Sequence, residues 1–126
     1  LRKIANLRGV FYNAKKLIGN EQISYWDVSN ATNMGYLFYG TSSFNQPIND
    51  WNVSKITDMS YMFKGSSFNQ PLNNWNVGKV TSMIFMLAGS QFNQPINSWN
   101  VSKVTSFRDM FSKNKKFNQP LDNWDV

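Results

Sequence analysis

Apolar residues recur along the 126-residue chain at a nearly constant interval. The most regular are tryptophans that lie two residues before a valine and 24 or 25 residues apart, namely Trp26, Trp51, Trp75, Trp99 and Trp124. A second string, FNQP followed by Ile or Leu, begins at Phe44, Phe68, Phe92 and Phe117. A fixed period of this length is typical of proteins whose repeats stack into a solenoid. We therefore expect one solenoid domain over residues 1–126.

The period divides the chain into about five units. Residues 1–30 form a degenerate first turn, residues 31–55, 56–79 and 80–103 are full repeats, and residues 104–126 form an incomplete last repeat. An atypical terminal unit is expected because the outermost turn has no neighbour on one side. The last unit carries no such cap. We expect further repeats or another molecule to cover that end, and self-association through it is one possibility.

Each unit has a pattern that predicts a strand, a helix and a return loop. Trp75 and Val77 alternate with the polar Asn76, which indicates a short strand with two inward side chains. Four apolar residues spaced 0, 3, 6 and 7 follow, as on one face of a short helix. Helix caps are expected from the threonines near the start of four of these sets, Thr32, Thr57, Thr81 and Thr105, and from Gly40, Gly65 and Gly89 after them, with Asn114 near that place in the last unit. We predict an α/β repeat solenoid, a leucine-rich-repeat-like right-handed coil with short parallel strands on one face and short helices on the other.

The recurring tryptophans and methionines are interpreted as core residues. Because the Trp positions alternate with polar neighbours, we favour buried rings whose indole N–H groups bond to a nearby loop carbonyl or Asn. An exposed stacking platform for carbohydrate or nucleic acid is the alternative. The Asn and Gln residues of each FNQP string are expected to hydrogen-bond along a ladder from one repeat to the next.

Composition limits the chemistry that the chain can perform. It contains no Cys and no His, which excludes disulfides, thiolate metal sites and every catalytic triad built on His. Seven Asp and Glu residues are present, and no two form an acid/base pair away from repeat positions. We predict that the protein is not an enzyme, that it has no catalytic, metal or cofactor-binding residues, and that this part of the chain has no transmembrane segment.

The net charge of +6 favours anionic partners. Specific nucleic-acid binding is not expected, because three Arg are present and the aromatic residues are assigned to the core. One candidate binding surface is the outward column of the predicted strands, Asp27, Asn52, Asn76, Asn100 and Asp125. A second is a basic ridge, Lys55, Lys79 and Lys103, whose charges would lie ~5 Å apart in neighbouring turns. A solvated sheet face and solvated loop charges are the alternative interpretations.

The string FNQPLNNWNV, followed by VTSM, resembles the repeat of BspA-like bacterial leucine-rich-repeat surface proteins, whose best-known members are mycoplasma surface lipoproteins. The resemblance covers residues 31–126 nearly completely and the first turn loosely. It implies a cell-surface or secreted protein that serves adhesion or the recognition of a host or neighbouring-cell protein or an anionic glycan. A passive or antigenically variable coat segment without a fixed ligand is the alternative.

Overall fold

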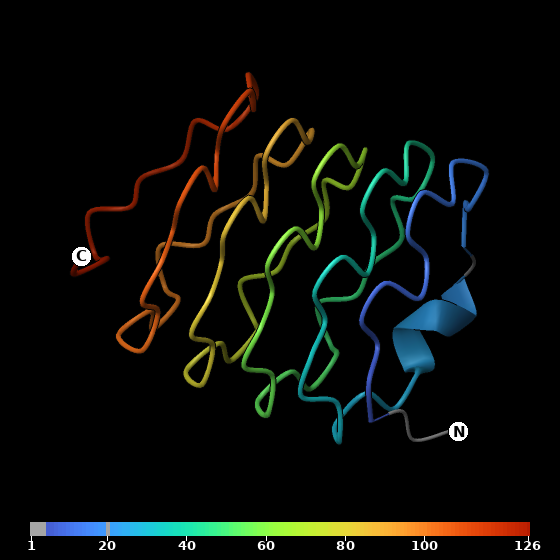
Figure 1. The fold of residues 1–126 in the computed structure, drawn as a ribbon, viewed down its shortest axis with the longest axis horizontal. Helices are drawn as coiled ribbons and strands as arrows, with labels where there is room; N and C mark the ends of the chain where they lie inside the picture. Colours follow the sequence, from blue (N-terminus) through green and yellow to red (C-terminus); the bar gives the residue numbers. More distant parts are fainter. Residues whose placement is uncertain (1–4, 20) are drawn as a thin grey trace.

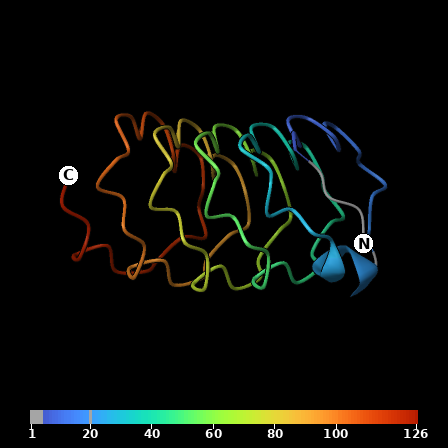
Figure 2. The ribbon, with the colours of Figure 1, turned by 90° about the horizontal axis from the view of Figure 1, so that it is seen from below.

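The computed structural model describes residues 5–19 and 21–126. The chain winds through successive coils that stack along one axis, from the N-terminal end to the C-terminal end (Figure 1). Seen from below, the coils lie side by side around a common interior (Figure 2). We number them by the repeat limits. Coil 1 is the described part up to residue 30, and coils 2 to 5 are residues 31–55, 56–79, 80–103 and 104–126.

Backbone hydrogen bonds join the coils along one side of the stack. In coil 2, the N–H groups of Met34, Tyr36, Phe38 and Gly40 donate to carbonyls of coil 3 at 2.8–3.0 Å. Between them, the N–H groups of Leu37 and Tyr39 donate to the carbonyl three residues earlier, and that of Gly35 donates to the Asn33 side chain at 2.8 Å. Coils 3 and 4 repeat this alternation. Isolated parallel bridges run along the same side and connect Asn33, Asp58, Ser82 and Ser106.

Within residues 5–19 and 21–126, the helices predicted on this side are not present, and the prediction is wrong. An α-helix requires consecutive N–H groups to bond four residues back, whereas every second N–H here bonds to the next coil. A left-handed residue also interrupts each segment, as at Tyr36 with a φ of 60°. Overlapping turns bury Met34, Leu37 and Phe38 with the same spacing that a helix would give. The helix that the described residues do contain is the 3₁₀ helix η1, Glu21–Tyr25, which lies in coil 1 outside the predicted positions.

Among the described residues, the strands predicted at each W-x-V string are also not present. The N–H of Trp75 donates to the carbonyl of Leu72, and that of Val80 donates to the carbonyl of Val77, so both close local turns. The bridges between described residues lie on the opposite, supposedly helical side. The α/β leucine-rich-repeat-like architecture is therefore contradicted. The W-x-V alternation indicates that two side chains point inward. A loop with a turn residue between these two side chains gives the same alternation as a strand does.

The interior is filled by columns of apolar side chains, as predicted. Trp51, Trp75 and Trp99 are 3–4% exposed, and each Nε1–H donates at 2.9 Å to a carbonyl of the preceding coil. The acceptors are the carbonyls of Ile23, Ile48 and Leu72, respectively. The buried methionines Met34, Met59 and Met83 confirm the predicted apolar stripe. In coil 5 the corresponding side chains Phe117 and Trp124 are half-buried, and self-association through this end stays a prediction.

The amide ladder predicted for the FNQP strings is confirmed. The Oδ1 atoms of Asn45, Asn69 and Asn93 accept the backbone N–H of the corresponding asparagine in the next coil, at 2.8–2.9 Å. Gln70 and Gln94 add side-chain bonds to the carbonyl of the asparagine in the coil before. These amides satisfy backbone groups at a corner where the proline prevents regular structure.

Candidate functional site

The predicted polar column lies in loops rather than on a strand face. The Oδ1 atoms of Asn52, Asn76 and Asn100 each accept the backbone N–H two residues ahead, at 3.0–3.1 Å. Asp27 makes the same bond at 3.0 Å, and Asp125 is exposed near the end of coil 5. Asn and Asp recur here because their side chains close this turn. The turn accounts for the pattern, and a binding role for the column stays a prediction.

The predicted basic ridge consists of exposed lysines that follow this turn in coils 2, 3 and 4. Lys55, Lys79 and Lys103 occupy equivalent positions, and Lys55 Nζ donates to Asn30 Oδ1 at 3.5 Å. The ridge lies on a loop surface and not beside a sheet. Its charges are exposed to solvent. The binding of anionic polymers by the basic ridge stays a prediction.

A surface that the sequence analysis missed lies on the side of the stack that carries the inter-coil hydrogen bonds. We call it the outer aromatic column, and it consists of Tyr12, Tyr36, Tyr39, Tyr61 and Phe85. The rings of Tyr36 and Tyr61 stack with centroids 4.5 Å apart and planes 6° apart. Phe85 continues the stack at 5.0 Å from Tyr61, and Tyr12 stacks on Tyr39 at 4.7 Å. Tyr12 is 51% exposed and the other four rings are half-buried, so their edges face solvent.

Three rings of this column lie on residues with an unfavourable backbone conformation. The φ angles of Tyr36, Tyr61 and Phe85 are 60°, 61° and 54°. The equivalent residues of coils 1 and 5 are Gly9 and Asp109, which tolerate left-handed backbone. A larger side chain there costs about 1–3 kcal/mol. Stacking offsets about 0.5–1.5 kcal/mol of this cost per aromatic pair, in addition to what the partial burial of each ring contributes.

Cationic groups lie over the rings of the outer aromatic column. The Arg8 guanidinium is 4.8 Å from the Tyr36 centroid, and Lys64 Nζ is 5.2 Å from that of Tyr39 and 5.8 Å from that of Phe85. Lys64 Nζ also donates to the Tyr39 hydroxyl at 3.5 Å. Burial, followed by the neighbouring Tyr61, raises the pKa of Tyr36, and Arg8 partly opposes that rise. The surface therefore combines neutral phenols with positive charges.

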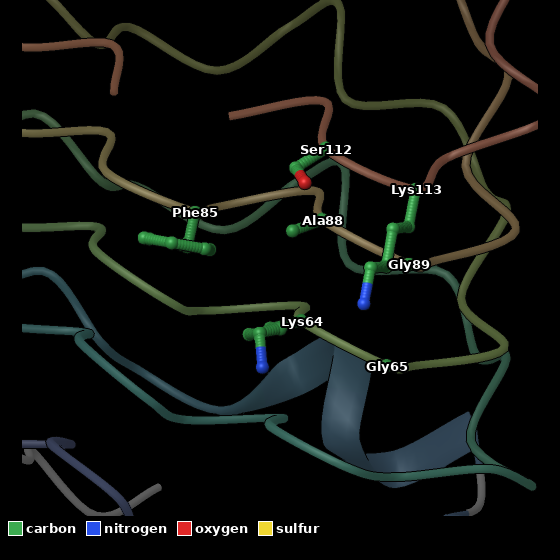
Figure 3. Close-up of a pocket in the computed structure, with 7 residues that line it drawn as sticks. All are labelled: Lys64, Gly65, Phe85, Ala88, Gly89, Ser112 and Lys113. Carbon is green, nitrogen blue, oxygen red and sulfur yellow. The ribbon is translucent and has the colours of Figure 1, made fainter. Parts of the chain in front are cut away.

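A hollow of about 220 Å³ opens where the outer aromatic column ends. Figure 3 shows its lining, in which Phe85 lies on one side and two lysines come from different coils. The lining residues are Lys64, Gly65, Phe85, Ala88, Gly89, Ser112 and Lys113. Its apolar part is a ring and small residues, and its polar part is two ammonium groups and a hydroxyl. The hollow is therefore suited to a small anionic group with an apolar face.

The chain matches one protein family, described as "Mycoplasma protein of unknown function, DUF285", over residues 1–91 and again over residues 66–126. The chain belongs to this family. The two overlapping matches are consistent with a repeated unit that the family pattern can fit in more than one register. No curated protein and no solved structure matches the DUF285 chain.

Aligning the repeats of this DUF285 chain by position would have revealed the outer aromatic column. Tyr36, Tyr61 and Phe85 each lie two residues after a buried methionine, and the helical interpretation gave that position no particular environment. Asn114 lies next to the glycine position of the last unit, as the sequence analysis placed it, but does not occupy that position. Lys113 holds the left-handed position with a φ of 58°, and Asn114 takes the next position, where its Nδ2 bonds back to coil 4.

The described part of the DUF285 chain contains neither a metal-binding cluster nor a membrane-spanning helix. Among residues 5–19 and 21–126, no group of three His, Cys, Asp or Glu side chains is placed to hold a metal ion. Over the same residues, none of the helical structure is long and apolar enough to cross a bilayer.

Proposed function

We propose that this chain is a non-catalytic recognition module that binds its partner through the outer aromatic column and the cations beside it. The observation that carries the proposal is the left-handed backbone of Tyr36, Tyr61 and Phe85 in three successive coils. Glycine closes the same turn in coil 1 without strain. Aromatic side chains retained at strained positions on a surface are characteristic of residues that serve binding.

The chemistry of the surface supports an anionic glycan as the partner. Tyrosine edges offer hydroxyl donors and acceptors beside apolar ring carbon, and this mixture suits a sugar, which has hydroxyl edges and C–H faces. Arg8 and Lys64 lie over the rings, and the net charge of +6 attracts a polyanion from a distance. The resemblance to BspA-like surface proteins supports a cell-surface or secreted location and a role in adhesion.

A glycan array that carries neutral and acidic oligosaccharides tests the proposal. We expect retention on acidic glycans, at the micromolar to millimolar affinities of a small polar interface. The Tyr36→Gly, Tyr61→Gly, Phe85→Gly variant removes the rings but suits the left-handed backbone, and we expect it to lose about tenfold or more in affinity. Circular dichroism and urea unfolding would verify that this variant is folded.

The matched comparison is the ridge variant Lys55→Gln, Lys79→Gln, Lys103→Gln, which removes three positive charges from a different surface. We expect its effect to be smaller and to disappear at higher salt, because only long-range attraction is weakened. Loss of binding in the ridge variant together with full binding in the glycine variant would place the site on the basic ridge. No retention on any glycan would favour the alternative of a passive coat segment.

A further inference from the structure

The hollow beside Phe85 lies where one register of the repeat changes from large to small side chains. In coils 1 to 5, the residue before the last left-handed position of each turn segment is Tyr12, Tyr39, Lys64, Ala88 and Ser112, respectively. The Tyr39 ring covers the coil surface next to Tyr12 and Tyr36. Ala88 and Ser112 cannot do so, and the space that a ring would fill is open next to Phe85 (Figure 3).

Glycines keep the floor of the hollow free of side chains. A Cβ atom on Gly89 would meet nothing within 4 Å, and one on Gly65 would meet only the Cα of Gly40 at 3.9 Å. The hollow therefore has open space above Gly89 rather than a closed wall. At about 220 Å³ it lies below the roughly 300 Å³ at which sites for drug-sized ligands begin, which suits a single ring.

Two lysines replace the smaller or uncharged residues that the repeat holds at equivalent positions. Lys64 takes the position of Tyr39, and Lys113 takes the left-handed position that is Gly40, Gly65 and Gly89 in the preceding coils. A lysine with a φ of 58° is strained where glycine is not. In Figure 3 its side chain runs past Gly89 toward the coil that carries Lys64. The Lys113 ammonium thus approaches the hollow, and the Lys64 ammonium lies at its edge, where it donates to the Tyr39 hydroxyl.

The lining contains no carboxylate that would neutralise these lysines. Asp109 follows Phe85 in the register of the outer aromatic column, but its Oδ2 lies 3.6 Å from Nε of Arg108. Its charge is therefore already accompanied by a cation. The two ammonium groups that flank the hollow leave a local excess of positive charge, which an anionic ligand would balance.

We propose that this hollow binds an acidic sugar unit, a pyranose that carries a carboxylate, within a glycan chain. The carboxylate lies between Lys64 and Lys113, a ring hydroxyl bonds to Ser112, and the C–H face of the sugar packs on Phe85. The inference rests on the proposed function, because it names the ligand class for the end of the same surface. The remainder of the glycan extends along the outer aromatic column.

A phosphate and a carboxylate would both satisfy the two lysines, so the choice of ligand rests on the apolar part of the hollow. An acidic peptide would satisfy the lysines but would leave the open floor beside Gly89 and Ala88 unfilled. A sugar ring with a carboxylate satisfies both parts.

The test is an NMR titration of the isotope-labelled chain with a hyaluronan tetrasaccharide, in which a uronic acid alternates with a neutral amino sugar. The carboxyl-reduced tetrasaccharide is the neutral probe, and an oligoglutamate and an oligothymidylate serve as acidic probes without sugar acid. We expect the acidic tetrasaccharide to shift the amides of Gly65, Gly89 and Ser112. We also expect about tenfold weaker binding of the reduced form, because charged hydrogen bonds are lost.

Three variants locate the binding. Lys64→Gln with Lys113→Gln keeps the side-chain size and should weaken binding about tenfold. Ala88→Tyr places in coil 4 the residue that coil 2 holds at the same register and should abolish binding by filling the hollow. Lys115→Gln with Lys116→Gln removes equal charge from exposed neighbouring positions and should stay within about twofold.

The outcomes separate this inference from the proposed function. If the tetrasaccharide binds but neither Lys64→Gln with Lys113→Gln nor Ala88→Tyr weakens it, the hollow is not the site and the recognition function stands. Equal or tighter binding of the reduced tetrasaccharide, the oligoglutamate or the oligothymidylate would likewise overturn the sugar-acid assignment alone. If no glycan of the array binds and the tetrasaccharide causes no shifts, both proposals are overturned.

Discussion

The inner rings of Phe44, Phe68 and Phe92 and the outer rings of Tyr36, Tyr61 and Phe85 run through the same three coils. Successive rings are 5.9–6.3 Å apart in the inner set and 4.5–5.0 Å apart in the outer set. The inner rings are fully buried, whereas the outer rings are half-buried and lie on left-handed backbone. Stacking is common to both sets. Burial stabilises the inner set fully and the outer set in part, and backbone strain opposes the outer set alone.

The largest expected effect comes from removing an inner ring. Phe68→Ala should lower the free energy of unfolding by about 3–5 kcal/mol, because a fully buried ring leaves a cavity that the coils fill only partly. The ring contacts Phe44, Phe63 and Phe92 at centroid distances of 4.5–6.3 Å. Urea unfolding followed by tryptophan fluorescence measures the loss. A loss below about 1 kcal/mol would mean that the inner set does not support the stack as described.

Gly and Ala variants at one position of each set distinguish backbone strain in the outer set from its absence in the inner set. At Tyr61, Gly should be more stable than Ala by about 1 kcal/mol, because the residue has a φ of 61°. At Phe68, Gly should be less stable than Ala by about 0.5–1 kcal/mol, because glycine loses more backbone freedom on folding. Urea unfolding of the four variants gives both differences. The same sign at both positions would contradict the assignment of strain to the outer set.

Periodicity predicted the inner rings, but it does not show that the outer rings lie on left-handed backbone. The inward positions Met34, Leu37 and Phe38 are spaced alike in a helix and in overlapping turns, so burial does not reveal which N–H groups bond to the next coil. The tryptophan core and the FNQP amides followed from side-chain chemistry, and both were predicted correctly. The left-handed backbone at Tyr61 is set by bonds on both sides of the coil, which no local pattern encodes.

The candidate site escaped prediction for a related reason. The hollow depends on Ala88 in place of a larger side chain and on Lys113 in place of glycine. Because Asn114 was considered as the cap near the glycine position of coil 5, Lys113 was not considered for that position. The predicted polar column was found correctly as a recurring pattern, yet its Asn52 and Asn76 side chains close turns. The regular column of Asn side chains thus reflects how the turns fold, whereas the candidate site lies where the repeat pattern changes.

The smallest expected effect is a pH dependence confined to the outer set. Burial and Tyr61 raise the pKa of Tyr36 in the folded chain, whereas in the unfolded chain it titrates near the usual value of about 10. Between these two values the folded state binds more protons than the unfolded state. The free energy of unfolding therefore falls as pH rises above about 10 and is unaffected by this group at lower pH.

Tyr36→Phe isolates this contribution, because it keeps the stacked ring but cannot ionise. The original chain should lose more stability than the variant between about pH 9 and pH 11, and lysine deprotonation, which is common to both, cancels in the difference. Urea unfolding at several pH values measures the two slopes. Equal slopes would mean that the Tyr36 hydroxyl is as free to ionise in the folded chain as in the unfolded one. A steeper fall in the variant would mean that the attraction between Arg8 and the phenolate outweighs burial, and the outer rings would then be stabilised by charge rather than opposed by strain alone.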